Sequence, residues 1–277
     1  MMSNETQARA FIDQLEARAN RQMVPYAHGQ MCWRSFGSGQ PLVLIHGGHG
    51  SWLHWVRNIE ALASRYTVWV PDLPGYGDST DLDNRGDFDA LLHALSTTLD
   101  TLVGESTLID IAGFSFGSVV ATLLAVRRPG VRRLVLIGVP GHGSQRRQHT
   151  KLVNWRRSSD AASMDADLLQ NLQGFMLHGP ADALALNVHR YSCVHTRFRS
   201  KGISQSPILL ESLDRFGGPT LILWGEHDVT CTPQYFGPQL AGGRANREWD
   251  IVPDAGHWLQ YEDYDGVNQR LLDWFGR

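Results

Sequence analysis

The chain has little cysteine, no long apolar run and little net charge. Its three cysteines, Cys32, Cys193 and Cys231, are odd in number and widely spaced, which argues against a disulfide framework or a cysteine-rich metal site and favours a reducing compartment. No stretch reaches the roughly 18 apolar residues of a membrane span, and the polar start of the chain lacks the apolar core of a signal peptide. A net charge of −3 gives no attraction to nucleic acid or anionic membranes. We expect a soluble, cytoplasmic protein whose partner is a small molecule.

Short apolar runs recur along the chain, separated by patterns typical of helices. The runs, each a candidate for a buried strand, span residues 41–48, 67–72, 107–113, 133–138 and 219–225. Apolar residues at helical spacing occur in 5–20, 88–102, 116–124 and 267–275. Strands that are apolar on both faces and alternate with helices predict a mostly parallel α/β sheet with helices on both faces. Such sheets bind ligands at the carboxyl ends of their strands.

One segment breaks this alternation. Residues 140–212 contain no strand pattern, only polar stretches and helical patterns such as 165–177. We interpret this segment as a helical lid inserted into an α/β core of residues 1–139 and 213–277, which suits a chain of 277 residues. The helix pattern at 5–20 can pack on its own domain or on a second subunit, so the sequence leaves a homo-oligomer open.

The strongest chemical pattern is Gly113-Phe114-Ser115-Phe116-Gly117. It directly follows an apolar run and directly precedes a helical pattern, which is the context of a strand–turn–helix elbow. The two glycines let strand and helix approach closely, while the serine occupies a strained turn that exposes its hydroxyl. We predict that Ser115 is a nucleophile; an ordinary turn of small residues is the alternative interpretation.

A nucleophilic serine needs a base, and the base needs a group that orients it. Asp228 lies in the loop expected after the run 219–225, and His257 lies just before the C-terminal helix pattern. The order Ser, Asp, His is that of one known class of triad. We predict that His257 accepts the proton of Ser115 and that Asp228 orients the imidazole and stabilises its charged form. Glu226 is the alternative acid.

The oxyanion that forms when a serine attacks a carbonyl carbon needs backbone N–H donors. We predict such donors at Phe116, the residue after the nucleophile, and at Gly48 in the glycine-rich segment 46–50. His46 in that segment is interpreted as structural. His49 is a candidate for substrate contact, with a solvent-facing loop histidine as the alternative.

Five motifs occur in the order and spacing of the α/β-hydrolase superfamily, which the chain resembles: residues 46–48 (HGG), 71–79 (PDLPGYGDS), 113–117 (GFSFG), 224–228 (WGEHD) and 256–258 (GHW). The resemblance covers nearly the whole chain apart from the lid. It implies a mostly parallel eight-stranded sheet, a helical cap and catalysis without a cofactor. The sequence does not indicate a catalytic metal either, because its twelve histidines form no His-x-x-x-His helix pair with a third ligand. Haloalkane dehalogenases and epoxide hydrolases of this fold use an aspartate where this chain has Ser115, so the resemblance excludes both activities.

Within the superfamily, residues 52–58 and 256–262 look like the carbon–carbon bond hydrolases of aromatic meta-cleavage pathways. Those enzymes hydrolyse vinylogous diketones formed by ring opening, so the resemblance implies a carboxylate-bearing carbonyl substrate. Their cap carries an arginine–aromatic pair that meets the carboxylate, and Arg197 with the following phenylalanine is similar to it. Independently, residues 140–205 hold nine Lys/Arg against four Asp/Glu, which favours an anionic substrate. Arg190 and Arg197 are the candidates for contact with it.

Large apolar side chains are further candidates for the pocket, because ligand sites are mostly apolar. They are Trp52, Trp55, Trp155, Phe175, Met176 and Trp258. Core packing is the alternative for each of them, and Trp258, next to His257, is the strongest candidate.

Two positions differ from the meta-cleavage pattern. Phe114 and His54 stand where those enzymes usually have asparagines that position the dienol end of the substrate. A small-molecule carboxylesterase needs the same triad without these asparagines and is therefore the alternative function. A non-catalytic ligand receptor of this fold is a third hypothesis, which the presence of Ser115, Asp228 and His257 disfavours.

Overall fold

The computed structural model describes residues 4–27, 29–140, 147 and 151–277. Its strands are β1 (Asn20–Tyr26), β2 (Gly29–Phe36), β3 (Gln40–Ile45), β4 (Tyr66–Pro71), β5 (Ile109–Phe114), β6 (Val131–Ile137), β7 (Thr220–Gly225) and β8 (Arg247–Val252). Its helices before β7 are α1 (Glu5–Ala17), η1 (Trp52–Trp55), α2 (Ile59–Ala63), α3 (Phe88–Val103), α4 (Phe116–Arg127), η2 (Trp155–Arg157), α5 (Ala161–Phe175), α6 (Ala183–Val194), α7 (Lys201–Gln205) and α8 (Ile208–Leu213). After β7 come α9 (Pro233–Ala241), α10 (Leu259–Glu262) and α11 (Tyr264–Phe275).

The strands form one eight-stranded sheet in the order β1-β2-β4-β3-β5-β6-β7-β8. Strand β2 pairs antiparallel with β1 and β4, and all the other pairs are parallel. The predicted mostly parallel sheet is therefore confirmed, and the apolar runs correctly indicated β3 to β7. Periodicity did not locate β1, β2 and β8. Edge strands β1 and β8 expose polar residues along their length, and β2 carries the buried Arg34, so none of the three reads as an apolar run.

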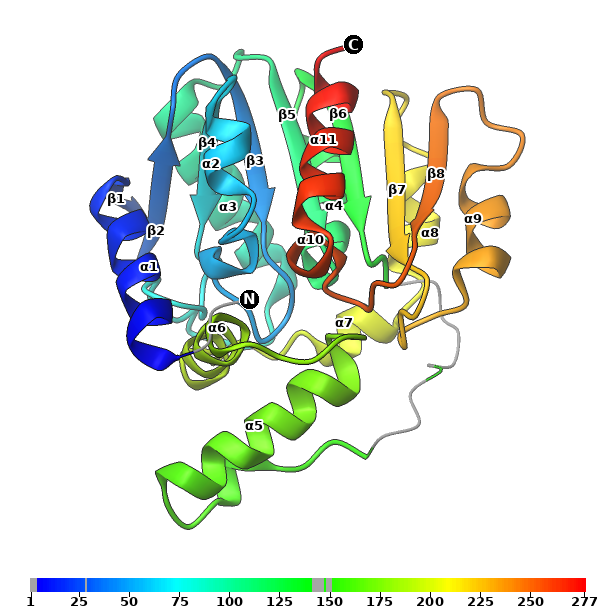
Figure 1. Cartoon of the computed structure of the whole chain (residues 1–277). Coiled ribbons are helices and arrows are strands. Elements are labelled where there is room, and N and C mark those ends of the chain that lie inside the picture. The colour runs from blue at the N-terminus through cyan, green and yellow to red at the C-terminus, as the bar shows by residue number, and fades with distance from the viewer. Residues whose placement is uncertain (1–3, 28, 141–146, 148–150) are drawn as a thin grey trace.

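The side chains of the sheet divide between two hydrophobic clusters, one on each face. In β3, Leu42 and Leu44 belong to one cluster, and Val43 and Ile45 belong to the other, as the alternation of a strand requires. Helices α1, α2 and α11 cover the first face, in front of the sheet in Figure 1, while α3, α4, α8 and α9 cover the second. Because both faces are buried, the central strands consist mostly of apolar residues.

Between β6 and β7 the chain leaves the sheet. Its described part, residues 151–213, forms helices without a strand, and we name it the helical insertion. Figure 1 shows α5, α6 and α7 at the carboxyl ends of the parallel strands, where the sequence predicts a lid. Helix α8 differs from the others because Leu209 and Leu213 pack into the core of the second face. Part of the predicted lid, 141–146 and 148–150, lies outside the described residues.

Helix α1 packs on its own chain, through the buried side chains of Ala8 and Leu15. It ends at Ala17 rather than at residue 20, because Asn20 already begins β1. Among the described residues, no helix is both long enough and apolar enough to cross a bilayer.

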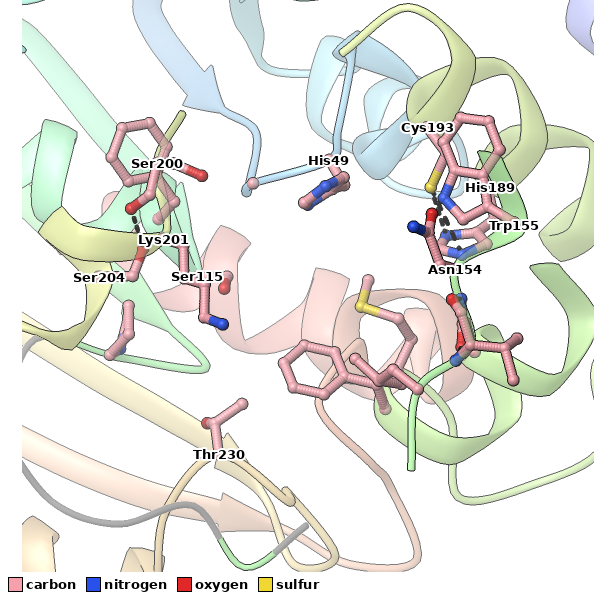
Figure 2. A pocket seen from close by; sticks show the side chains of 18 of the residues that line it. His49, Ser115, Asn154, Trp155, His189, Cys193, Ser200, Lys201, Ser204 and Thr230 are labelled. Atoms are coloured by element: carbon pink, nitrogen blue, oxygen red, sulfur yellow. Dashed lines mark hydrogen bonds between the residues drawn. The ribbon is translucent and has the colours of Figure 1, made fainter. Parts of the chain in front are cut away.

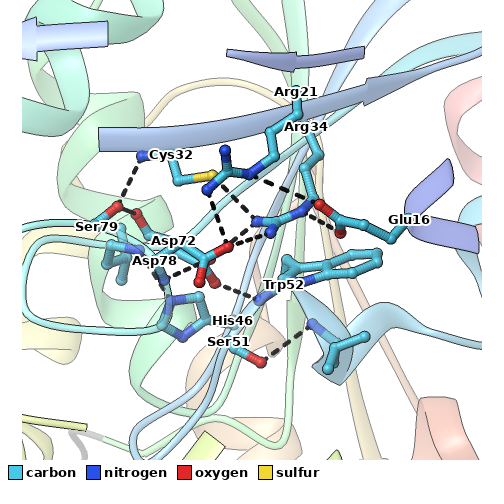
Figure 3. Close-up of polar contacts among 12 residues, drawn as sticks. Glu16, Arg21, Cys32, Arg34, His46, Ser51, Trp52, Asp72, Asp78 and Ser79 are labelled. Carbon is cyan, nitrogen blue, oxygen red and sulfur yellow. Dashed lines mark hydrogen bonds and ion pairs between the residues drawn. The ribbon is translucent and has the colours of Figure 1, made fainter. Parts of the chain in front are cut away.

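A buried ion network connects the sheet to the loop after β4 and to α1. Arg34 of β2 is 2% exposed, and its guanidinium donates to Glu16 at 2.6 Å, Asp72 at 3.0 Å and Asp78 at 2.5 Å (Figure 3). Asp78 in turn accepts the hydroxyl of Tyr191 in α6 at 2.8 Å. The motif PDLPGYGDS thus carries two aspartates that bind Arg34 of β2, and one of them, Asp78, also contacts the helical insertion.

Candidate active site

Ser115 occupies a sharp turn between β5 and α4. Its backbone has φ 51° and ψ −121°, a conformation that a residue with a side chain rarely adopts. A Cβ on Gly113 would lie 2.3 Å from the carbonyl oxygen of Gly117, and a Cβ on Gly117 would lie 2.4 Å from the carbonyl oxygen of Ile45. Both positions therefore require glycine, as the elbow pattern predicts.

The structure brings Ser115, His257 and Asp228 into one hydrogen-bonded chain. The hydroxyl of Ser115 lies 2.9 Å from Nε2 of His257, and Nδ1 of His257 lies 2.9 Å from Oδ2 of Asp228. His257 is 1% exposed and Asp228 is fully buried. The three residues follow β5, β8 and β7, so the carboxyl ends of parallel strands assemble the site. Glu226, the alternative acid, is exposed, and its carboxylate accepts a hydrogen bond from the N–H of Asp254 instead of one from His257.

The surroundings of Asp228 keep its carboxylate ionised. Burial by itself would raise the pKa of Asp228, but His257 and the hydrogen bonds from Thr230 outweigh it and hold the pKa below its usual range. Thr230 donates both its N–H, at 2.7 Å, and its hydroxyl, at 2.6 Å, to Oδ1. With Asp228 as an acceptor, Nδ1 of His257 carries the proton and Nε2 is free to accept the proton of Ser115.

The glycine-rich loop after β3 approaches the nucleophile closely. A Cβ on Gly47 would lie 3.1 Å from Cβ of Ser115. Nδ1 of His46 donates to the carbonyl oxygen of Gly47 at 2.8 Å, and its Nε2 accepts the N–H of Leu73 at 3.0 Å, so His46 braces the loop as predicted. His54 accepts the N–H of Gly47 at 3.2 Å, which leaves the next N–H as the candidate donor to an oxyanion.

That next donor is Gly48, which lines the same cavity as Ser115 and Phe116. Phe116 is the first residue of α4, so its N–H has no acceptor within the helix and lies at the positive end of the helix dipole. No described residue accepts the N–H of Gly48. The two predicted oxyanion donors are thus adjacent to the nucleophile and unengaged within the part of the chain that the structure describes.

A cavity of about 840 Å³ opens beside Ser115, between the sheet and the helical insertion (Figure 2). Trp155, Phe175 and Met176 from the insertion line it as predicted, and so does His49. Trp52 and Trp55 are instead core residues, 2% and 0% exposed. The described lining contains no Asp or Glu, so the cavity has no negative charge of its own.

Among the described residues that line the cavity, the cations are Lys201 and Arg156. Burial and the nearby Arg156 lower the pKa of His49, and burial lowers the pKa of His189 to about 4. Both histidines are therefore neutral at physiological pH. Burial also raises the pKa of Cys193 to about 12, so its thiol, 3.6 Å from Nε2 of His189, stays protonated and does not compete with Ser115.

Arg190, Arg197 and Trp258 were predicted to meet the substrate, and the structure places none of them in the cavity lining. Arg190 pairs with Glu5 and Asp165. The guanidinium of Arg197 pairs with Asp81 and donates to the carbonyl oxygens of Ser79 and His195. Trp258 is 1% exposed and donates its indole N–H to the carbonyl oxygen of His54 at 2.9 Å. All three are held by partners within the protein.

Lys201 and Arg156 are two of the nine basic residues in the predicted lid, and no sequence pattern distinguishes them from the other seven. No motif in the sequence singles out His189 or Thr230. The position of Thr230, two residues after Asp228, does indicate a contact, because an Asp side chain commonly accepts hydrogen bonds from the residue two positions on. The cavity positions of Lys201, Arg156 and His189 had no such local signal.

The fold and this site define a class. A family model described as the alpha/beta hydrolase fold matches residues 40–264, and the chain belongs to that family of enzymes. It is 30% identical over 270 residues to a 2-hydroxy-6-oxononadienedioate/2-hydroxy-6-oxononatrienedioate hydrolase of Paraburkholderia phymatum, covering 87% of this chain and 89% of the relative. The resemblance to meta-cleavage hydrolases is thereby confirmed at the level of the family.

Solved structures share the fold at lower identity. A meta-cleavage product hydrolase from Pseudomonas fluorescens superposes with a TM-score of 0.71 at 21% identity, covering 92% of this chain and 97% of the other. A carboxylesterase from Bacillus subtilis superposes with a TM-score of 0.72 at 19% identity, covering 98% of each chain. Both likenesses establish the fold and leave the reaction open.

Proposed function

We propose that the protein is a serine hydrolase with Ser115 as nucleophile, His257 as general base and acid, and Asp228 as the group that orients His257. The observation that carries the proposal is the hydrogen-bonded chain from Ser115 through His257 to Asp228 beside a cavity. Nε2 of His257 takes the hydroxyl proton as Oγ attacks a carbonyl carbon, and it later returns that proton to the leaving group. The N–H groups of Gly48 and Phe116 stabilise the oxyanion, each by about 3 kcal/mol.

We further propose that the substrate carries a carboxylate and that the reaction is carbon–carbon bond hydrolysis of a ring-fission product. The relative at 30% identity is named for a dioate, which is a dicarboxylate. The cavity suits an anion because Lys201 and Arg156 line it without any Asp or Glu. No described carboxylate pairs with either cation, and residues 141–150, part of which is not described, contain no Asp or Glu. Both cations are thus available to a ligand.

A specific feature favours a carboxylesterase as the second candidate. Phe114 is fully buried between the rings of His54 and His257, with centroid separations of 5.2 and 5.1 Å. Since Nδ1 of His54 is occupied by Gly47, neither side chain replaces the asparagines that position a dienol in the meta-cleavage enzymes. An ester does not need those groups.

The test is a parallel hydrolysis assay on a ring-fission dienoate and on a short p-nitrophenyl ester. Ser115→Ala should lower kcat by several orders of magnitude on whichever of the two substrates the protein hydrolyses, and the fold should stay intact. Ser159→Ala, at an exposed serine, is the control and should leave kcat unchanged. Loss of the dienoate chromophore with weak ester hydrolysis supports the carbon–carbon hydrolase, and the reverse supports the carboxylesterase. Undiminished activity in Ser115→Ala would refute both.

A further inference from the structure

Three potential metal ligands from separate segments meet outside the cavity. His178 follows α5 in the helical insertion, His227 lies in the loop after β7, and Asp254 lies in the loop after β8. One ligand atom from each residue lies within 4.8 Å of the other two. The imidazole rings of His178 and His227 are stacked, with centroids 3.6 Å apart and an angle of 11° between their planes. None of the three residues lines the cavity beside Ser115.

The backbone holds these residues in place. Glu262 accepts the N–H of His178 at 2.8 Å and the N–H of Gly256 at 2.6 Å, which joins the insertion to the loop after β8. The N–H of His227 donates to the carbonyl oxygen of Ala255 at 2.9 Å, which joins the loops after β7 and β8. The side chains therefore start from fixed positions, and only their torsions remain to be set when a ligand binds.

The donor set suits a divalent transition metal. Two imidazoles and one carboxylate are a common set for Zn²⁺, with water filling the remaining position. At metal–ligand distances of about 2.0–2.2 Å, ligand atoms of one tetrahedral ion lie roughly 3.3–3.6 Å apart. In the structure one ligand atom of each residue lies within 4.8 Å of the other two, so movements of the side chains alone can bring the atoms to this spacing. The stacked rings must rotate about χ2 before their lone pairs converge, and this torsion has a broad energy well.

A second carboxylate lies beside this group. Oε2 of Glu226 is 3.9 Å from Nε2 of His227 and accepts the N–H of Asp254 at 3.3 Å. Glu226 is 46% exposed and His227 is 40% exposed, so an ion can reach them from solvent. The adjacent negative charges of Asp254 and Glu226 lower the energy of a cation at this position.

We propose that His178, His227 and Asp254 bind a divalent transition-metal ion, for which Zn²⁺ is the probe. The bound ion links the helical insertion to both loops that carry proposed catalytic residues, since His227 adjoins Asp228 and Asp254 precedes His257 in the same loop. The ion would restrain movement of the insertion relative to those loops. Binding itself does not depend on the proposed hydrolytic function, so the two proposals can fail separately.

Isothermal titration calorimetry of the full chain, freed of metal by a chelator, tests the site with Zn²⁺ alone. We expect one Zn²⁺ per chain and a higher Tm in its presence. His227→Ala and His178→Ala should each weaken Zn²⁺ binding by at least about tenfold and abolish the rise in Tm. Removing a metal ligand lowers the affinity more than removing a residue that only supports a ligand. The matched control is His93→Ala, at an exposed histidine of α3, which should bind as the unmodified chain does.

Asp254→Asn provides a third variant that keeps the backbone conformation. Asp254 has φ 53°, and asparagine tolerates this left-handed region as aspartate does, so weaker Zn²⁺ binding in this variant reports the lost charge. No binding to the unmodified chain, or equal binding to the His227→Ala chain, would overturn the proposal. Either result leaves the hydrolysis of a substrate by Ser115 untouched.

Discussion

The backbone and the hydroxyl of Ser115 are constrained from different directions. The N–H of Ser115 donates to the carbonyl oxygen of Ile137 in β6, and its own carbonyl oxygen accepts the N–H of Ser118 in α4, both at 2.8 Å. The strained φ of 51° persists because strand and helix hold both sides of the residue. The hydroxyl, in turn, is hydrogen-bonded to Nε2 of His257.

The two cations of the cavity differ in how they are held. Arg156 donates to the carbonyl oxygen of Thr196 at 3.3 Å and lies over the ring of Trp155, with Cζ 4.3 Å from the ring centroid. Lys201 begins α7, and Figure 2 shows its side chain directed into the cavity on the side of Ser115. An ammonium group there can meet a substrate carboxylate close to the reacting carbonyl.

Lys201→Met removes that charge and keeps most of the side-chain volume. We expect KM for a carboxylate-bearing substrate to rise about tenfold, because a hydrogen bond to a charged group contributes about 1.5–3 kcal/mol, while a neutral ester is little affected. Steady-state kinetics on both substrates measures the difference. Arg157→Met, at an exposed arginine outside the cavity, is the control. An equal change on both substrates would show that Lys201 does not recognise an anion.

At the scale of elements, the close approach of α4 to β3 holds the elbow together. A Cβ on Gly117 would lie 2.4 Å from the carbonyl oxygen of Ile45 and 2.5 Å from that of His46. Both contacts are to backbone, which cannot swing away as a side chain can. Helix α4 and strand β3 can therefore lie this close together only because position 117 carries no side chain.

Gly117→Ala should destabilise the protein by about 2–3 kcal/mol, because the new methyl group forces backbone apart. Gly202→Ala in α7 is the matched change, since a Cβ there has no neighbour within 4 Å. Alanine should stabilise that helix by about 0.5–1 kcal/mol. Thermal unfolding followed by circular dichroism compares the two variants. Similar Tm values for both would argue against the close contact at the elbow.

At the scale of the whole molecule, the network around Arg34 links α1, β2 and the loop after β4 (Figure 3). The hydrogen bond from Tyr191 to Asp78 extends it to α6. Within it, burial would raise the pKa of Asp78, but hydrogen bonds from Tyr191 and Arg34, and the charge of Arg34, hold it below the usual range. A carboxylate with a depressed folded-state pKa stabilises the fold above its unfolded pKa of about 3.9. That stabilisation is lost as the pH falls through the folded-state pKa.

Asp78→Asn should therefore lower the free energy of unfolding at neutral pH by about 1–3 kcal/mol, a range reduced for the partial exposure of the side chain. The difference from the unmodified chain should begin to shrink as the pH falls below about 4 and should disappear once the pH has passed through the lowered folded-state pKa of Asp78, where that side chain is protonated as well. Urea unfolding across this pH range measures it. Asp83→Asn, at an exposed aspartate in the same region, is the control, and a pH-independent difference for Asp78→Asn would contradict the assignment.

The sequence by itself determined the features that depend on neighbours along the chain. Apolar runs located β3 to β7 because central strands are buried on both faces, and the Gly-x-Ser-x-Gly spacing located the elbow because the turn needs small residues on each side of Ser115. The order of Ser115, Asp228 and His257 also predicted that they meet, since parallel strands end at one edge of the sheet.

Only the tertiary structure decided which charges face the cavity and which residues share a surface. Arg190 pairs with Glu5, 185 residues away, and Arg197 pairs with Asp81, 116 residues away, so nothing near either arginine marks it as occupied. The grouping of His178, His227 and Asp254 likewise depends on three segments meeting. Contacts between distant segments form because the chain packs, and the composition of one segment does not specify its partner in another.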